Sequence, residues 1–395
     1  MRRLLLIGTL LLSACSEPPP PTPLSLPVPA SDAKVELSIR ADYSQHLNAS
    51  AHNALSRAEE AAASLRLAIS QLVVDGSPTQ LALAREAWRN SYSAYLESLA
   101  VSGIPVVEPP EWVAAGITQD AVHTLLNSWP MEPGYVDYVE GYALTGIVND
   151  TTLTLSRDQL LAQHRFADTY AASIGYPVIE ILLWGEDGQR PASDYDPNAE
   201  PRLDETTPVA HQVRRGEYLS LLGELLQDHL QRLQMRWDSN NGYYAMRLRE
   251  VDALSSFRAM LHSAQDLIEL TLLNRYLGQD SSSPYSQSQA EDVQALMLGL
   301  RRALLPGGSL PISTQGENGI DRRDAADDDI DAMMESEGDL DEASDNAAHA
   351  QEKTLAALTA SDSACLNLSE DITPCREQLL ALLAAIQATQ DHLIR

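Results

Sequence analysis

The chain has 395 residues, of which 44% are hydrophobic, so it is long enough to bury at least one large core. It carries 56 acidic and 27 basic side chains, which gives a formal net charge of -29 at pH 7. Such a surface repels phosphate backbones, so we expect no nucleic acid as a partner, whereas cationic ligands such as metal ions are compatible with it.

The amino terminus predicts an export signal that ends in a lipid-attachment site. Two arginines precede an apolar run at residues 4–12, and a Ser-Ala-Cys sequence ends at Cys15. The run is far shorter than the ~20 residues of a membrane-spanning helix. Cleavage before Cys15 exposes a thiol for acylation, so we expect residues 1–15 to be a lipoprotein signal peptide and lipobox. Because Ser16 follows the cysteine, we expect attachment to the outer membrane, facing the periplasm.

Residues 16–34 predict an extended tether between the lipid and the body of the protein. Seven prolines fall between positions 17 and 30, and such a segment favours a polyproline conformation over a packed core. After it, no second apolar stretch approaches the length of a membrane span. We therefore expect a water-soluble body that a lipid on Cys15 holds at the membrane.

Helical periodicity dominates this body. Apolar residues recur at spacings of three and four in five segments: Ala51–Leu72, Leu81–Leu99, Leu219–Trp237, Leu254–Leu272 and Glu377–Ile394. Gly76 with Pro78, and Gly103 with Pro105, predict the ends of the first two helices. No segment shows the sustained alternation of a half-buried strand. The sequence therefore predicts an all-α protein whose helices pack as antiparallel bundles.

Two irregular stretches organise the predicted body. Glycine and proline recur between about 186 and 210, which predicts a long connection between an N-terminal bundle at 35–205 and a C-terminal bundle at 206–395. Residues 316–345 are acidic and lack the glycine and glutamate pattern of a calcium-binding loop. We interpret them as a solvated linker inside the second bundle.

The negative charge of the whole chain is compatible with cationic ligands, and it is also compatible with a role in keeping the protein soluble and no other role.

Cys365 and Cys375 predict a disulfide. They lie ten positions apart, and an exported protein meets oxidising conditions. Closing such a loop is worth about 2 to 3 kcal/mol in the chain-entropy model. Two thiols without a nearby histidine make a poor metal site, so the structural interpretation is favoured.

Four sequence blocks carry a resemblance to a known family: Ala87-Trp88 with Tyr95, residues 129–139, residues 175–187 with 190–195, and Arg214-Arg215 through Trp237. In order and spacing they resemble the imelysin family of bacterial envelope proteins. With weaker similarity at Ser286 to Asp292, the resemblance covers most of residues 45–300. It implies two four-helix-bundle-like halves with a cleft between them. It also implies a link to iron uptake, or a zinc-dependent peptidase activity associated with a Gly-x-His-x-x-Glu motif.

The chain departs from this motif at its histidine. Gly175 and Glu180 match the motif, but Pro177 occupies the histidine position. A histidine and a glutamate three positions apart on a helix face the same side and can converge on one cation, whereas proline offers no side-chain lone pair. Proline does suit the first turn of a helix, and Gly175 permits a sharp entry into that turn. The fold can therefore survive while one ligand is lost.

Glu180 remains as the main candidate for binding chemistry. A carboxylate among valine, isoleucine, leucine and tryptophan needs a cation, a metal or several hydrogen bonds, because isolated burial is very costly. The resemblance places Asp137, Arg190 and Asp194 in the same cleft as Glu180. An ion pair between Arg190 and Glu180 is therefore the structural alternative to metal binding, and iron or zinc would be the candidate metal.

These observations favour one function over two others. We expect a non-catalytic envelope lipoprotein that binds a metal or another ligand, is linked to iron uptake, and serves an iron-uptake or redox partner in the envelope. The first alternative is a zinc-dependent metallopeptidase, for which only Glu180 can be nominated as a ligand. The second is a structural or interaction lipoprotein whose cleft holds only an internal salt bridge.

Overall fold

The computed structural model describes residues 38–39, 43–199, 211–278, 283–305, 312–313, 349–350, 352–366, 368 and 371–394. All of them belong to one compact unit that spans Val35–Arg395. The expectations for Cys15, for the tether at 16–34 and for the acidic linker at 316–345 lie outside the described residues. The boundary between two bundles near residue 205 stays a prediction.

Most of the described residues are helical, which confirms the all-α fold class and is consistent with a bundle arrangement. The elements in chain order are β1 Ser38–Ile39, α1 Tyr43–Asp75, α2 Pro78–Ser102, α3 Pro110–Ala114, α4 Gln119–Leu126, α5 Pro133–Val136, α6 Gly146–Asn149, α7 Arg157–Gln163, α8 Tyr176–Trp184, η1 Ala192–Asp194, α9 Gln212–Arg236, α10 Tyr243–Arg249, α11 Ala253–Asp266, η2 Leu267–Tyr276, α12 Gln289–Leu304, β2 Ile312–Ser313 and α14 Thr373–Ile394. The two short strands pair in an antiparallel manner. No helix within the described ranges is long and apolar enough to cross a membrane.

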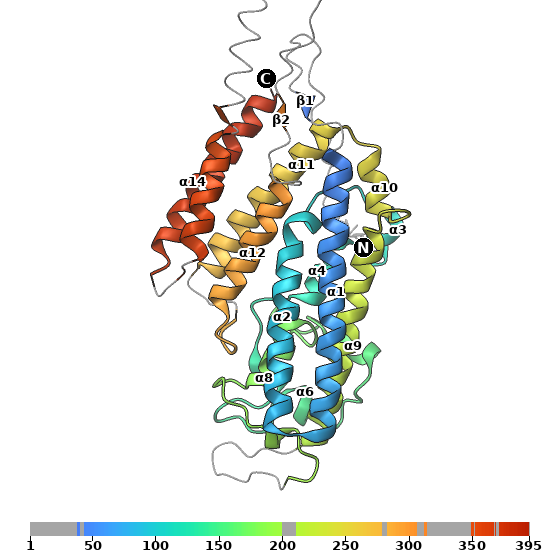
Figure 1. The fold of residues 1–395 in the computed structure, drawn as a ribbon. Helices are drawn as coiled ribbons and strands as arrows, with labels where there is room; N and C mark the ends of the chain where they lie inside the picture. The colour runs from blue at the N-terminus through green and yellow to red at the C-terminus, as the bar shows by residue number, and fades with distance from the viewer. Residues whose placement is uncertain are drawn as a thin grey trace, which may run out of the picture. The chain divides into compact units, whose positions relative to one another are not determined.

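The turn between α1 and α2 shows how the sequence ends one helix and begins the next. The Ser77 side chain accepts a hydrogen bond from the backbone N–H of Gln80, and Pro78 occupies the first turn, where a missing N–H costs nothing. Gly76 has a φ of +59°, which a residue with a side chain rarely adopts. The two helices therefore reverse direction at the predicted position (Figure 1).

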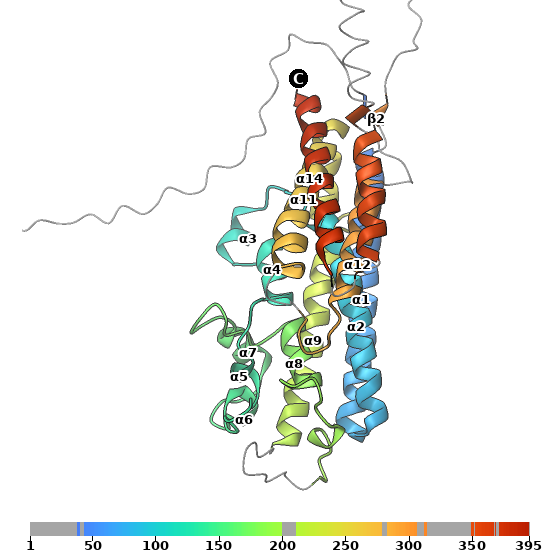
Figure 2. The same ribbon diagram turned by 90° about the vertical axis from the view of Figure 1, so that its left-hand side faces the viewer.

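Three long helices form the centre of the described fold. α1 packs along α2 and α9, and α2 also packs along α12 (Figure 1). The periodic apolar residues of the first predicted segment, from Ala51 to Leu72, face this core and are fully buried. The short helix α8 contacts α2, α9 and α5 (Figure 2). It is this helix that carries the Gly175–Glu180 motif.

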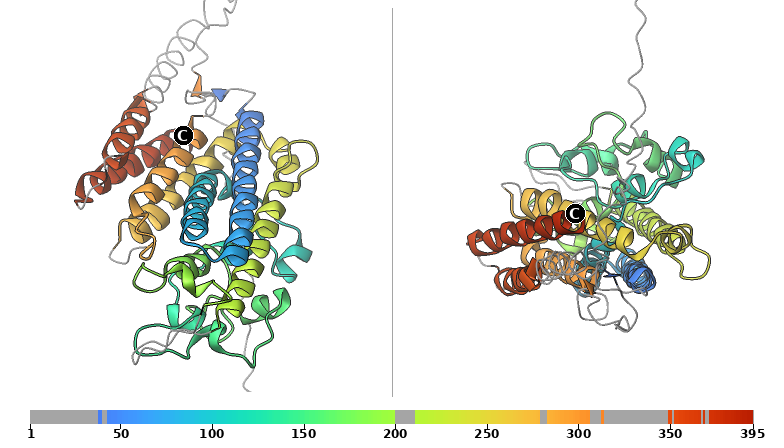
Figure 3. Two further views of the ribbon diagram at one scale, coloured as in Figure 1. Left: turned by 60° about the horizontal axis from the view of Figure 1, so that its bottom comes forward. Right: turned by 90° about the horizontal axis from the view of Figure 1, so that it is seen from above.

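The C-terminal helix α14 packs against α11 and η2, on the side of α11 that lies away from α1 (Figure 3). A disulfide joins Cys365, in a helical stretch at 352–366, to Cys375 near the start of α14. Both cysteines are buried, at 0% and 1% exposure. The bond that the spacing predicts is therefore formed, and it ties together two successive helical segments.

Candidate functional site

The helix α8 begins where the family motif predicts it. Gly175 precedes the helix with a φ of +101°, and a Cβ at this position would lie 2.6 Å from the carbonyl oxygen of Leu126. Only glycine fits both the backbone angle and the space. Pro177 lies in the first turn of α8, and every residue of the helix is buried. The entry through Gly175 and the start at Pro177 agree with the expectation from the sequence.

Glu180 lies in the middle of α8 and is only 1% exposed. Its Oε1 atom accepts two hydrogen bonds from Ser286, one from the backbone N–H at 2.8 Å and one from the hydroxyl group at 2.5 Å. The alternative of an ion pair with Arg190 is not formed among the residues that the structure describes, because Arg190 binds two aspartates elsewhere. Hydrogen bonds from a distant segment therefore stabilise this carboxyl group.

A second buried carboxyl group continues this network. The Ser286 hydroxyl lies 3.0 Å from that of Ser288, which donates to Asp292 at 3.2 Å, and Ser283 also donates to Asp292. All these side chains are at most 4% exposed. We name the set of Glu180, Ser283, Ser286, Ser288 and Asp292 the carboxyl–serine cluster. It connects α8 to the segment before α12 and to α12 itself.

The two acids of the carboxyl–serine cluster favour their neutral forms. Burial raises the pKa of Glu180 to about 7, against the hydrogen bonds from Ser286, and the nearby charge of Asp292 acts in the same direction as burial. Burial likewise raises the pKa of Asp292 to about 7, although Ser283 and Ser288 donate to it and Arg275 lies near. Each of the two acids is therefore more protonated near neutral pH than an exposed carboxyl group would be.

The other predicted residues form a separate buried ion cluster. Arg215 binds Asp137 with two parallel hydrogen bonds, at 2.7 Å from Nε and 3.1 Å from Nη2. Arg190 pairs with Asp137 at 2.8 Å and with Asp194 at 3.1 Å. We name these four residues the arginine–aspartate cluster. Its two positive and two negative groups balance, which is the arrangement that makes buried charges tolerable.

Further contacts fix the arginine–aspartate cluster in place. The Tyr138 hydroxyl donates to Asp194 at 3.0 Å, and the Tyr138 ring lies under both guanidinium groups, 5.0 Å from Arg190 and 5.6 Å from Arg215. Burial would raise the pKa of Asp137, but the charges of Arg215 and Arg190 outweigh it and hold that pKa below its usual value. Asp137 is therefore ionised at neutral pH and compensates two arginines.

The expectation that Glu180, Asp137, Arg190 and Asp194 share one cleft stays a prediction. Each of the four is buried, at most 3% exposed. Asp137, Arg190 and Asp194 do come together, but Glu180 belongs to the other cluster. Side chains that sequence spacing could not place, above all Arg215 and Ser286, fill the positions around them.

These residues do not fit a zinc or iron site. A catalytic zinc takes three protein ligands and one water, and no described group of three histidine, cysteine, aspartate or glutamate side chains is arranged to hold a metal ion. Pro177 supplies no ligand atom, and Glu180 already accepts hydrogen bonds from Ser286. In the arginine–aspartate cluster, two guanidinium groups occupy the space beside the carboxylates and would repel a cation.

Sequence reasoning missed five members of these clusters as site residues: Arg215, Ser283, Ser286, Ser288 and Asp292. A signal was present for four of them, because Arg215 belongs to the fourth block, and Ser286, Ser288 and Asp292 belong to the weaker similarity near residue 290. The partner of each was not readable, since Arg215 lies 78 positions from Asp137 and Ser286 lies 106 positions from Glu180.

Comparisons with known proteins bear on the family and on the fold. The sequence model of a family described as Imelysin matches residues 51–389. Two solved structures resemble the fold. A candidate iron-regulated protein A precursor from Parabacteroides distasonis is 14% identical, with a TM-score of 0.54 over 91% of this chain and 98% of that one. An imelysin-like protein from Psychrobacter arcticum is 13% identical, with a TM-score of 0.52 over 90% and 94%. A search of curated proteins found no match.

Proposed function

The chain belongs to the imelysin family, and from this premise we propose that it is a non-catalytic, lipid-anchored binding protein of the cell envelope that serves iron uptake. One observation carries the non-catalytic part. At the family motif, Pro177 replaces the histidine, and the carboxyl group of Glu180 is bound by the backbone and hydroxyl groups of Ser286. The motif therefore connects α8 to the segment before α12, which is a structural task.

The chemistry of hydrolysis supports the same proposal. A zinc peptidase needs an open coordination position for water and a cleft that admits a peptide. Glu180 is buried at 1% exposure, and this burial raises the pKa of its carboxyl group to about 7. The zinc-dependent metallopeptidase that the family resemblance offers as an alternative is therefore the weaker candidate.

Two further observations support the location in the cell envelope and the link to iron uptake. Cys15 ends a sequence typical of lipoprotein signals, and a diacylglyceryl group with an amide-linked chain provides two anchors. One structural neighbour is named for regulation by iron. We therefore propose that the body is held at the outer membrane and works with an iron-uptake or redox partner in the envelope, and that Glu180 does not hold the iron.

Deletion of the gene followed by complementation tests this proposal. Under iron limitation, the deletion strain should take up less radioactive iron, and the wild type and Glu180→Gln should restore uptake. A Cys15→Ser variant should leave the outer-membrane fraction and restore little. Unchanged iron uptake in the deletion strain would contradict the iron link. Loss of complementation by Glu180→Gln, with normal protein levels, would contradict the structural role of Glu180.

A peptidase assay addresses the alternative directly. The purified protein, supplied with zinc, should cleave unstructured peptides no faster than Glu180→Gln does. Zinc-dependent cleavage that the substitution abolishes would establish the metallopeptidase instead.

A further inference from the structure

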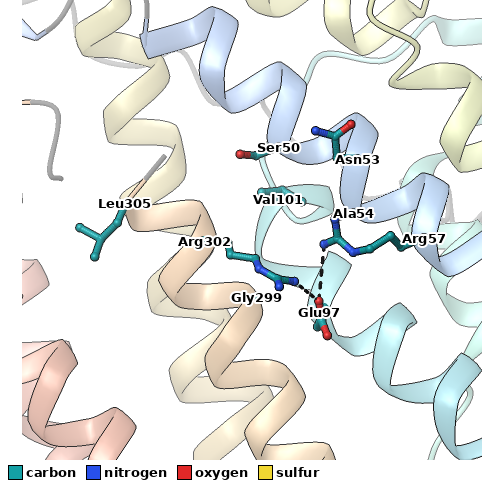
Figure 4. Close-up of a pocket in the computed structure, with 9 residues that line it drawn as sticks. All are labelled: Ser50, Asn53, Ala54, Arg57, Glu97, Val101, Gly299, Arg302 and Leu305. Carbon is teal, nitrogen blue, oxygen red and sulfur yellow. Dashed lines mark hydrogen bonds and ion pairs between the residues drawn. The ribbon is translucent and has the colours of Figure 1, made fainter. Parts of the chain in front are cut away.

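A pocket of about 190 Å³ lies where α1, α2 and α12 meet, apart from both buried clusters (Figure 4). Charged and polar groups line one part of it, namely Ser50, Asn53, Arg57, Glu97 and Arg302, and apolar side chains line the rest. Its volume is below the ~300 Å³ at which pockets for drug-sized ligands begin, so any occupant is small. We name it the α1–α2–α12 pocket.

Two arginines from different helices meet over one carboxylate in this pocket. Arg57 on α1 lies 3.5 Å from Oε2 of Glu97, and Arg302 on α12 pairs with the same oxygen atom (Figure 4). The two guanidinium side chains are 45% and 48% exposed, whereas Glu97 is 18% exposed. The charged lining therefore carries one excess positive charge, in a chain whose formal net charge is -29.

Most hydrogen-bond donors around the pocket have no acceptor within the described part of the protein. A guanidinium group carries five N–H donors, and Arg57 and Arg302 have Glu97 as their one partner there. The Ser50 hydroxyl and the Asn53 amide also line the pocket and make no side-chain hydrogen bond to a described residue. Donors from four residues on two helices, α1 and α12, thus surround the space, and Glu97 is the one carboxylate among the lining residues.

The backbone of α12 brings these groups together. A Cβ on Gly299 would collide with the backbone carbonyl oxygen of Glu97, so only glycine permits the close contact of α12 with α2. Arg302 lies one turn after Gly299 and is thereby placed beside Glu97. The two arginines therefore converge because α12 approaches α2 closely at Gly299. Two long side chains at a loosely packed surface contact would not require such a close approach.

We propose that the α1–α2–α12 pocket binds a small organic anion through a carboxylate group of the ligand. Planar guanidinium groups match carboxylates with paired hydrogen bonds, and Ser50 and Asn53 add neutral donors. The apolar side chains of Ala54, Val101 and Leu305 provide a wall for a short carbon chain, which inorganic phosphate lacks. This site shares no residue with the Glu180 motif and does not depend on the proposed function.

Glu97 has a particular role in this arrangement. Its carboxylate occupies the donors that a ligand would use and repels an incoming anion, so it competes with the ligand. Neutralising it should therefore strengthen binding. A purely structural salt bridge predicts no such gain, because removal of Glu97 would then only weaken the contact between α2 and α12.

Titration calorimetry of the full protein with succinate, butyrate and inorganic phosphate at fixed low ionic strength tests the proposal. Succinate and butyrate should bind to one site, and phosphate should bind more weakly. Arg57→Gln and Arg302→Gln should each weaken binding by about tenfold, the size of one charge-assisted hydrogen bond. Glu97→Gln should tighten binding by at least about threefold, as expected from removal of a partly exposed like charge.

Arg66→Gln is the matched control, because Arg66 also lies on α1 and lines a different pocket with Glu224. It should leave binding unchanged. The tighter binding expected for Glu97→Gln cannot arise from misfolding. Circular dichroism of Arg57→Gln and Arg302→Gln checks that their weaker binding does not arise from misfolding either. Absence of carboxylate binding in both wild type and Glu97→Gln would overturn the proposal. Binding of phosphate alone, or binding that Arg66→Gln reduces as much as Arg302→Gln does, would also overturn it.

Discussion

Replacing Glu180 by glutamine should remove part of the pH dependence of stability. Burial raises the pKa of Glu180 to about 7 in the folded protein, from an ordinary value of 4.5. At about 1.36 kcal/mol for each pH unit, this difference corresponds to about 3 kcal/mol. The unfolded chain releases the proton near pH 4.5, and the folded protein retains it until about pH 7. The neutral carboxyl group therefore makes its full contribution to the free energy of unfolding below pH 4.5, and this contribution is lost as the pH rises to about 7.

Urea unfolding followed by tryptophan fluorescence, from about pH 4 to about pH 8, measures this effect. Relative to the wild type, the free energy of unfolding of Glu180→Gln should rise by about 3 kcal/mol over this range. The exposed Glu269 provides the matched control, because Glu269→Gln removes one carboxylate in the same way outside the carboxyl–serine cluster. A difference between Glu180→Gln and wild type that does not change with pH would refute the assigned state of this carboxyl group.

Three further substitutions test the surrounding structure by the same unfolding assay. Asp137→Asn leaves two buried guanidinium groups without their shared carboxylate and should cost about 3–5 kcal/mol, so a loss below about 1 kcal/mol would contradict that pairing. Gly175→Ala introduces a Cβ 2.6 Å from the Leu126 carbonyl oxygen and should cost more than about 1 kcal/mol; wild-type stability would contradict this geometry. Replacing Cys365 and Cys375 by serine should cost about 2–3 kcal/mol, and an equal loss in reduced wild type would verify the cause.

The sequence predicted the helices well because their signals are local. Gly76 and Pro78 mark the end of one helix and the start of the next, and α1 ends at Asp75 while α2 begins at Pro78. The predicted segment from Leu219 to Trp237 lies almost entirely within α9, Gln212–Arg236. In each case, the apolar period and the capping residues lie within one helix, so no distant partner decides the outcome.

The candidate site could be predicted only in part, because its contacts join distant segments. The motif placed Gly175 and Pro177 correctly at the start of α8, since both act through their own backbone angles. Burial of the Glu180 carboxyl group was expected, with an Arg190 ion pair as the alternative to a bound metal. Among the described residues Arg190 pairs with Asp137 and Asp194 instead. Ser286, the partner in the structure, lies before α12, and only the packing of α12 on α2 and the position of α8 bring the two together.

The central claim is that Glu180 is a hydrogen-bonded partner of Ser286 and not a metal ligand. Calorimetric titration of wild type and Glu180→Gln with zinc tests this claim. At about pH 8, which is above the raised pKa of Glu180, the carboxyl group is ionised, and these conditions are the most favourable to metal binding. We expect no zinc binding that distinguishes the two proteins. Binding of one zinc ion by the wild type that Glu180→Gln abolishes would contradict the claim.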